Sequence, residues 1–209
     1  MSGAYADDVA YPQRMDDPAE PLPRRWSAAT SRPDMWVDPG DDPRESNVEM
    51  VDERSTLLEF LRGCRVTLEL KCQGLDAEQL ARRSVPPSTM SLLGMLRHMA
   101  RVEHHWFRRV MAGEGVPRLF SEGGVRDADW DGARPDPDLV EQAWALWRAE
   151  VAFAEQFVSE TDDLGTPGQL DDGEPIPLRV VLVHMIEEYA RHGGHADLLR
   201  ERIDGRVGQ

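Results

Sequence analysis

Residues 181–205, VLVHMIEEYARHGGHADLLRERIDG, carry the pattern that decides the fold. Apolar residues recur in them every three or four positions, which is the spacing of an amphipathic α-helix. The pattern stops at Asp204-Gly205, and a glycine just past the last periodic residue is typical of a helix end. We therefore predict a long last helix over about 177–203.

Three earlier segments show the same helical spacing, and we expect helices over about 51–73, 90–112 and 137–160. Ser88 or Thr89 stands where its side chain can cap the second of these helices. No segment alternates apolar and polar residues with a period of two, and no internal repeat is visible. Four long amphipathic helices predict an all-α protein, a four-helix bundle.

Two longer segments join these helices. Residues 113–137 are rich in Gly, Pro and Asp and are too long for a tight turn. We expect them to form a long crossover loop between the second and third helices. Residues 161–176 are expected to form a second, acidic loop before the last helix.

Residues 1–50 differ from the rest of the chain. They hold seven of its fifteen prolines and many aspartates, without helical periodicity. Such a segment buries too little apolar surface to repay its ordering entropy. We expect an irregular N-terminal arm there, with Trp26 and Trp36 able to pin it onto the domain. The bundle is expected to occupy residues 51–205.

The composition argues against several classes of protein. The 24 basic and 39 acidic residues give a net charge of −15, which repels the phosphates of nucleic acids and of anionic membranes. No run of about 18 apolar residues is present to span a membrane. The acidic start MSGAYADDVA does not resemble a signal peptide, so a cytoplasmic location is expected. Cys64 and Cys72 lie about 12 Å apart on one predicted helix, beyond the reach of a disulfide.

The six histidines fall in two of the predicted helices and nowhere else: His98, His104, His105, His184, His192 and His195. Imidazole is the commonest protein ligand for borderline metals, and bundles assemble metal sites from facing helices. The distribution therefore favours a metal site between the second and last helices. The competing interpretation, for each histidine taken singly, is a hydrogen-bonded core residue.

Four potential ligands share one face of the last helix. With His184 at zero, Glu188, His192 and His195 fall at about 40°, 80° and 20°. The stripe spans about 16 Å, so one ion can take only a pair on adjacent turns. The candidate pairs are His184/Glu188, Glu188/His192 and His192/His195. Glu188 belongs to two of them, and an inward-facing glutamate is costly unless it is paired or metal-bound.

On the second helix, His98 and His105 differ by about 20° and share a face. His105 is therefore expected either to line a pocket beside His98 or to lie in the core. His104 points about 120° away from His98, which predicts a position on the surface. The HExxH, GxSxG, Walker and GxGxxG motifs are absent, which disfavours a thermolysin-type protease.

The two histidine-bearing segments, SLLGMLRHMARVEHHWF (91–107) and the last helix quoted above, resemble the DinB-like superfamily of metal-binding four-helix bundles. More narrowly, they resemble its branch of mycothiol-dependent S-transferases, which includes the mycothiol-dependent maleylpyruvate isomerases. The resemblance covers about 51–205 and includes Trp130 of the crossover loop. It has no counterpart for the N-terminal arm.

The resemblance implies a ligand set for the metal. His98 matches the ligand on the second helix, and Glu188 and His192 match the pair on the last helix. Glu188 stands where many relatives have histidine, as it does in the maleylpyruvate isomerase branch. His195 matches a frequent extra histidine one turn further on, which is not usually a ligand.

Two imidazoles and one carboxylate around Zn²⁺ leave a coordination position open, as in catalytic zinc sites; Ni²⁺ or another divalent ion is an alternative. That position can activate water or deprotonate a thiol. The resemblance implies the thiol: mycothiol, or a similar small thiol, delivered to an electrophilic small molecule by a transferase or isomerase. A non-catalytic metal- or ligand-binding bundle acting in stress response, and a metallohydrolase, stay open as alternatives.

Two further polar residues lie near the predicted ligands. Arg191 is placed either to contact an anionic thiol or substrate, or simply on the surface. Asp197 can support a ligand imidazole or lie on the outer side of the helix. The expected partners are thus a small-molecule substrate and a thiol, without nucleic acid or membrane; the sequence is also compatible with a homodimer.

Overall fold

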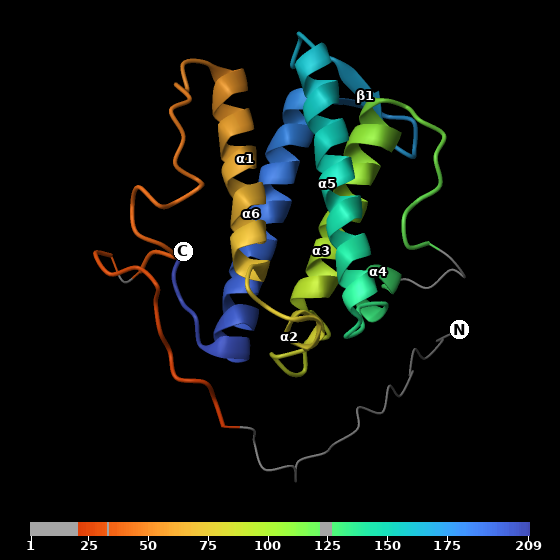
Figure 1. Ribbon diagram of the computed structural model, residues 1–209. Coiled ribbons are helices and arrows are strands. Elements are labelled where there is room, and N and C mark those ends of the chain that lie inside the picture. Colours follow the sequence, from red (N-terminus) through yellow and green to blue (C-terminus); the bar gives the residue numbers. More distant parts are fainter. Residues whose placement is uncertain (1–20, 33, 122–126) are drawn as a thin grey trace, which may run out of the picture.

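The computed structural model describes residues 21–32, 34–121 and 127–209, and within them the chain is mostly helical. Four long helical segments run side by side (Figure 1). They are α1 (Glu53–Cys72), α3 (Leu92–Glu103) with its continuation η1 (His104–Met111), α5 (Pro137–Glu160) and α6 (Leu178–Asp204). The prediction of an all-α fold is confirmed.

Short-range side-chain chemistry sets most helix ends. Asp52 caps α1 in a capping box with Ser55. Asp136 caps α5, whose first residue is Pro137, a residue that costs no hydrogen bond at that position. Gly205 ends α6 in the left-handed conformation, with φ at 81°, as its place in the sequence predicted.

The start of α3 differs from the predicted one. Ser91 is the cap, and its side chain accepts a hydrogen bond from the Gly94 backbone N–H. The prediction of Ser88 or Thr89 is wrong, because Ser88 Oγ instead accepts a hydrogen bond from the Met90 N–H within the preceding turn.

The second long helix changes its hydrogen-bonding pattern halfway along. From His104 to Met111 it is a π-helix, and at its end the Ala112 N–H donates to the Phe107 carbonyl five residues earlier. A π-helix turns less per residue than an α-helix. Side-chain directions in this helix, calculated at 100° per residue, are therefore valid only as far as Glu103.

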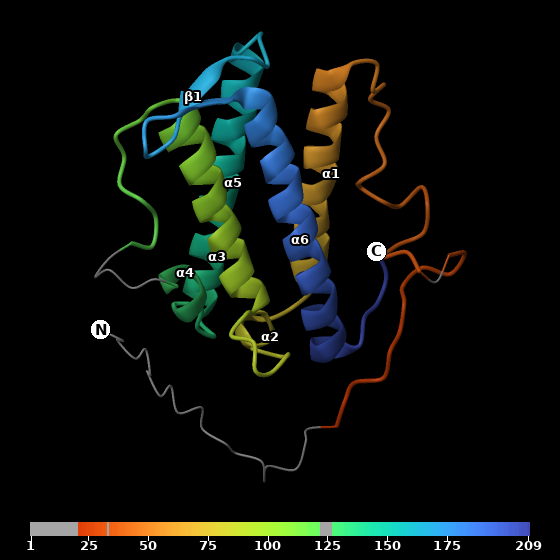
Figure 2. The ribbon, with the colours of Figure 1, turned by 180° about the vertical axis from the view of Figure 1, so that it is seen from behind.

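Packing pairs the helices two by two, because α1 lies mainly against α6 and α3 mainly against α5. The view from behind shows α3 and α6 as neighbours on one side of the bundle (Figure 2). Apolar side chains from all four helices fill the space between them, among them Leu61, Leu68, Leu92, Leu96, Met99, Trp147, Leu182 and Met185.

A buried polar network also joins the four helices, with one residue from each. Arg65 of α1 donates two hydrogen bonds of 2.8 Å to the carboxylate of Glu103 on α3. Tyr189 of α6 donates to the same carboxylate at 2.7 Å, and Trp147 of α5 donates to the Tyr189 oxygen at 2.8 Å. These bonds give hydrogen-bond partners to the polar groups of the four side chains, as buried polar groups require.

The connections contain short elements of their own: α2 (Ala77–Ala81), α4 (Ala128–Asp131) and an antiparallel pair of strands, β1 (Pro167–Gln169) and β2 (Pro175–Pro177). The expectation of a plain loop before the last helix is therefore wrong. Strands of three residues are too short to show an alternating pattern in the sequence. Within the predicted crossover loop, residues 122–126 lie outside the described part of the chain.

The described part of the N-terminal arm is irregular and runs along the bundle to the C-terminal segment. Trp36 is 1% exposed, and its ring lies 4.0 Å from the Lys71 ammonium. Trp26 pairs its backbone with Arg206 but leaves much of its ring exposed. Trp36 is thus the buried anchor of the arm. The prediction for residues 1–20 lies outside the described residues.

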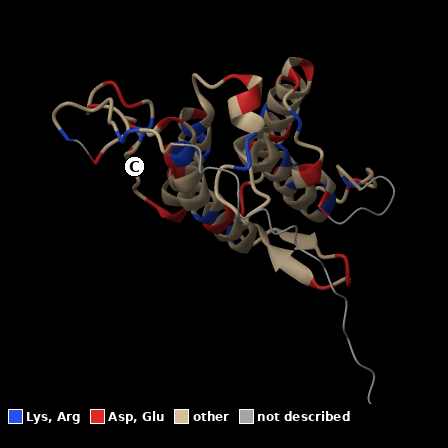
Figure 3. Ribbon diagram, turned by 90° about the horizontal axis from the view of Figure 1, so that it is seen from below, with Lys and Arg blue, Asp and Glu red and all other residues tan. Residues whose placement is uncertain are grey.

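Acidic and basic residues are both spread over the helices (Figure 3). The chain has one lysine, Lys71, and the fold buries it in an ion pair of 2.6 Å with Asp197. Among the described residues, none of the helices combines the length and the apolar character needed to cross a membrane.

Candidate metal centre

Three potential ligands converge where α3 faces α6. His98 projects from α3, and Glu188 and His192 project from consecutive turns of α6. One ligand atom from each lies within 4.8 Å of the other two. His192 Nε2 is 3.6 Å from Glu188 Oε2, and the rings of His98 and His192 meet edge to face. All three side chains are half-buried.

A buried carboxylate holds the first of these ligands. His98 Nδ1 donates to Asp129 Oδ2 at 2.8 Å, because an ionised carboxylate can only accept. The other ring nitrogen, Nε2, is then free to act as a ligand, an arrangement typical of histidines bound to metal. The short helix α4 places Asp129 there, with its side chain fully buried.

The charge of Asp129 is maintained despite its burial. Burial raises the pKa of this carboxyl, but the hydrogen bond from His98 and the guanidinium of Arg101 outweigh that effect and hold it below its usual range. Arg101 Nη1 lies 3.3 Å from Asp129 Oδ2. The carboxylate is therefore ionised at neutral pH, as a partner for an imidazole N–H must be.

An aromatic side chain fixes the ligand rings from one side. Trp130 stacks on His98 with centroids 5.0 Å apart and lies 5.8 Å from the ring of His192. Glycine is required opposite it, because a Cβ at position 94 would lie 2.9 Å from Trp130 Cε3. Gly94 thus allows α4 to approach α3 closely enough for Asp129 to reach His98.

The environment also keeps the second histidine neutral. Burial lowers the pKa of His192 to about 4, and the neighbouring His98, His195 and Arg191 act in the same direction. A neutral imidazole has the lone pair that a metal ligand needs. Two imidazoles and one carboxylate therefore fit a divalent ion with a coordination position left open.

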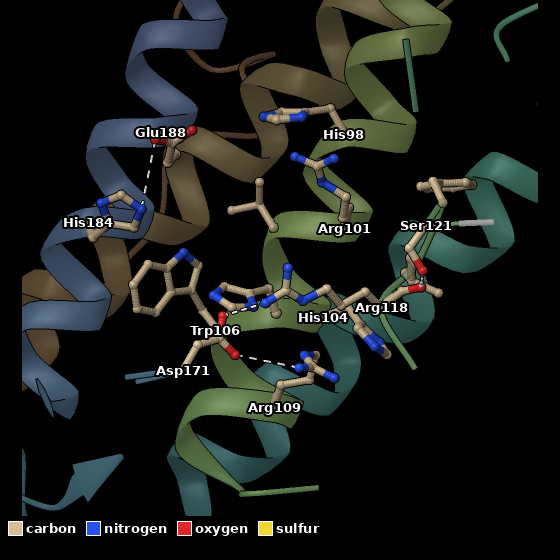
Figure 4. Close-up of a pocket in the computed structure, with 14 residues that line it drawn as sticks. His98, Arg101, His104, Trp106, Arg109, Arg118, Ser121, Asp171, His184 and Glu188 are labelled. Carbon is tan, nitrogen blue, oxygen red and sulfur yellow. Dashed lines mark hydrogen bonds and ion pairs between the residues drawn. The ribbon is translucent and has the colours of Figure 1, made fainter. Parts of the chain in front are cut away.

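A cavity of about 580 Å³ opens beside these residues, and Figure 4 shows its wall. His98 and Glu188 lie at one end of it, near His184. Its other wall comes from η1 and from the described part of the crossover loop. The volume is within the range of small-molecule sites.

Comparison with known proteins places this bundle in a family. The family model for mycothiol S-transferase matches residues 56–205. The chain belongs to the mycothiol S-transferase family. The family expected from the sequence motifs is thereby confirmed.

The fold of this mycothiol S-transferase family member is also found among solved structures. One of them is the crystal structure of a conserved protein from Enterococcus faecalis, with a TM-score of 0.51 over 72% of this chain and 96% of that chain. At 15% sequence identity the likeness concerns the fold alone. No curated protein matches the sequence significantly.

Of the remaining predicted site residues of this family member, His195 contacts a donor and His105 lines the same cavity, whereas Arg191 and Asp197 are paired elsewhere. His195 Nδ1 lies 3.5 Å from His192 Nδ1, and the two rings meet edge to face. Arg191 pairs with Glu187 on the exposed side of α6. Asp197 pairs with Lys71 and makes no contact with a ligand imidazole in the described structure. His105 lines the cavity, and burial lowers its pKa.

The surface position predicted for His104 is wrong. Its side chain is buried, and its Nε2 donates to the Pro117 carbonyl at 2.9 Å. Its Nδ1 lies 3.4 Å from Glu150 of α5. The face of the second long helix that carries His104 is covered by α5 and the crossover loop. The apolar periodicity of a helix shows one buried face and does not reveal that a second face is covered as well.

Sequence reasoning assigned no role to the two residues that hold His98 in place, Asp129 and Trp130. Asp129 is one of three aspartates in the run DADWD, and nothing in the spacing distinguishes it from Asp127 or Asp131. Trp130 was noticed only through the family resemblance. The signal that could have found Asp129 is its position directly before that tryptophan.

Proposed function

We propose that this protein is a metal-dependent S-transferase that joins mycothiol to an electrophilic small molecule. A divalent ion, zinc by preference, would be held by His98, Glu188 and His192. The observation that carries the proposal is the convergence of these three donors within 4.8 Å beside the cavity, in a chain of the mycothiol S-transferase family.

The ion, when bound, would supply a Lewis-acid position at which a thiol loses its proton near neutral pH. Glu188 contributes one negative charge, so the three ligands would leave a divalent ion with a net charge of +1. An anionic sulfur would balance that charge in a half-buried site, where an unpaired charge is costly. A thiolate is a softer ligand than water, and zinc binds soft sulfur ligands well, which favours the transferase over a hydrolase.

Other side chains prepare the site. Asp129 holds His98 in one tautomer, and Trp130 keeps the ring in place by stacking on it. His184 Nε2 lies 3.8 Å from Glu188 Oε1 and faces the cavity, where it can accept the thiol proton. The sulfur then attacks the electrophile from within the cavity.

Metal analysis tests the ligand set. The wild type, His98→Ala and Glu188→Gln are purified in parallel, with His105→Ala as the matched control, since it removes another histidine of the same cavity wall. We expect stoichiometric zinc in the wild type and the control and loss of zinc in the two ligand variants. Equal zinc in all four proteins would refute the ligand set.

Activity is measured next, with mycothiol and an electrophile, before and after chelation. Turnover that requires both thiol and metal supports the transferase. Retention of metal or thiol without turnover would instead identify a binding protein, and turnover with water alone would identify a hydrolase.

A further inference from the structure

Three arginines line the cavity beside the three donors: Arg101, Arg109 and Arg118 (Figure 4). We refer to them as the arginine cluster. They come from α3, from η1 and from the crossover loop, so the fold and not one sequence run brings them together. A concentration of positive charge in one cavity is unexpected in a chain whose net charge is −15.

The carboxylates near the cluster do not neutralise it. Arg118 Nη2 lies 2.6 Å from Asp171 Oδ2, and Arg109 Nη2 lies 3.6 Å from the other oxygen of the same residue. Two guanidinium groups thus share one carboxylate. Arg101 faces the ionised carboxylate of Asp129 at 3.3 Å, so these two charges balance each other. With the charge of Glu188 assigned to the metal, Arg109 and Arg118 keep one positive charge in excess of Asp171.

The cluster also has hydrogen-bond donors that are available to a ligand. Arg109 Nε is buried and has no hydrogen-bond partner among the described residues. Asp171 is exposed and pairs with Arg118 at the open side of the cavity, so this ion pair can exchange for a contact with a ligand. Guanidinium groups bind carboxylates through two parallel hydrogen bonds, which gives both strength and orientation.

We propose that the arginine cluster binds a carboxylate of the electrophilic substrate, so that the substrate class is an anionic, carboxylate-bearing electrophile. The inference rests on the proposed function. Mycothiol has no ionisable group apart from its thiol, so the cluster is not needed for the thiol substrate. The carboxylate would orient the electrophilic carbon toward the end of the cavity formed by His98 and Glu188.

A matched pair of electrophiles tests the proposal: 4-chloro-3,5-dinitrobenzoate and its neutral benzamide, each with mycothiol and the zinc-loaded protein. In this reaction the sulfur–carbon bond forms, the carbon–chlorine bond breaks, and chloride leaves with the bonding electron pair. The thiol proton goes to the protein or to solvent. Each kcat/KM is divided by the uncatalysed rate constant, which removes the difference in intrinsic reactivity.

We expect the benzoate to be favoured over the benzamide by roughly tenfold or more in the wild type, the size of one charged hydrogen bond. Arg118→Gln should lower that ratio about tenfold, mainly through KM for the benzoate. Asp171→Asn should raise it, since it removes the competing carboxylate. Arg191→Gln is the control, because Arg191 lies outside the cavity and should leave the ratio unchanged.

The two proposals fail in different ways. If both compounds turn over with a benzoate-to-benzamide ratio of corrected kcat/KM near one, and Arg118→Gln and Asp171→Asn do not change that ratio, the arginine cluster is refuted as a carboxylate site. That result would not contradict the proposed transferase activity. If neither compound turns over, binding of 3,5-dinitrobenzoate and 3,5-dinitrobenzamide is measured by calorimetry. Preference for the benzoate that Arg118→Gln abolishes supports the cluster without the transferase; equal binding overturns it.

Discussion

Asp129 Oδ2 lies 2.8 Å from His98 Nδ1, so a fully buried carboxylate from the crossover between the second and third long helices orients a side chain of the candidate metal centre. The contact joins two residues 31 positions apart in the chain. It decides which nitrogen of His98 is free to face Glu188 and His192. The crossover is therefore part of the site.

Replacing that carboxylate by an amide should weaken metal binding while leaving the shape of the side chain. We expect Asp129→Asn to lower zinc affinity by about 10- to 100-fold, the usual effect of removing a partner that orients a metal-bound histidine. Competition with a chromophoric chelator measures the affinity. Asp131→Asn is the control, since Asp131 pairs with Arg83 on the exposed side of the same helix. Equal affinities for both variants would contradict the role of Asp129.

A second prediction follows from the close approach of α4 to α3. Gly94→Ala places a Cβ 2.9 Å from the ring of Trp130, and should cost about 1–3 kcal/mol in free energy of unfolding through overpacking. Gly63→Ala in α1 meets nothing within 4 Å and should instead stabilise by roughly 0.5–1 kcal/mol. Urea unfolding of the two variants compares them. A stable Gly94→Ala protein with unchanged zinc affinity would show that Trp130 need not lie against the ligands.

Much of the fold could be predicted because its signals are local. The expected third helix, 137–160, matches α5 residue for residue, since Asp136-Pro137 marks its start in the sequence itself. The end of α6 was equally readable from Gly205. In contrast, β1 and β2 are too short to carry a pattern of their own.

The three donors could be proposed from helical spacing and family resemblance, but their surroundings could not. Asp129 reaches the site from the short helix α4 and Arg118 from irregular chain, and the placement of both depends on tertiary contacts. Asp197 was expected either to support a ligand imidazole or to lie on the outer side of the helix, and it pairs with the buried Lys71. Helical periodicity predicts the direction in which a side chain points. It does not predict which residue from another part of the fold the side chain will contact.

Breaking the buried network of Arg65, Glu103, Trp147 and Tyr189 should destabilise the bundle. Glu103→Gln leaves the buried Arg65 charge with only the exposed carboxylate of Glu155, 3.5 Å away, which should cost about 3–5 kcal/mol. Tyr189→Phe removes only hydrogen bonds and should cost about 1 kcal/mol for each. Chemical denaturation measures both free energies. Equal, small losses would mean that water or rearrangement compensates for the missing carboxylate.

Cys72 should make the stability depend on pH in the alkaline range. Burial raises the pKa of this thiol from 9.0 to about 12 in the folded protein. Between these values the unfolded chain has lost the proton and the folded chain keeps it, so stability falls as the pH rises, by up to about 1.4 kcal/mol per pH unit.

The Cys72→Ala variant isolates that contribution, because it lacks the thiol and keeps every other titrating group. The stability advantage of the wild type over this variant should be constant below pH 9 and shrink progressively above it. Urea unfolding at pH 8, 9.5 and 10.5 measures the difference. The same series with Cys64→Ala, whose thiol is less buried, should show a weaker trend. A difference that stays constant from pH 8 to 10.5 would show that the Cys72 thiolate is tolerated inside the bundle.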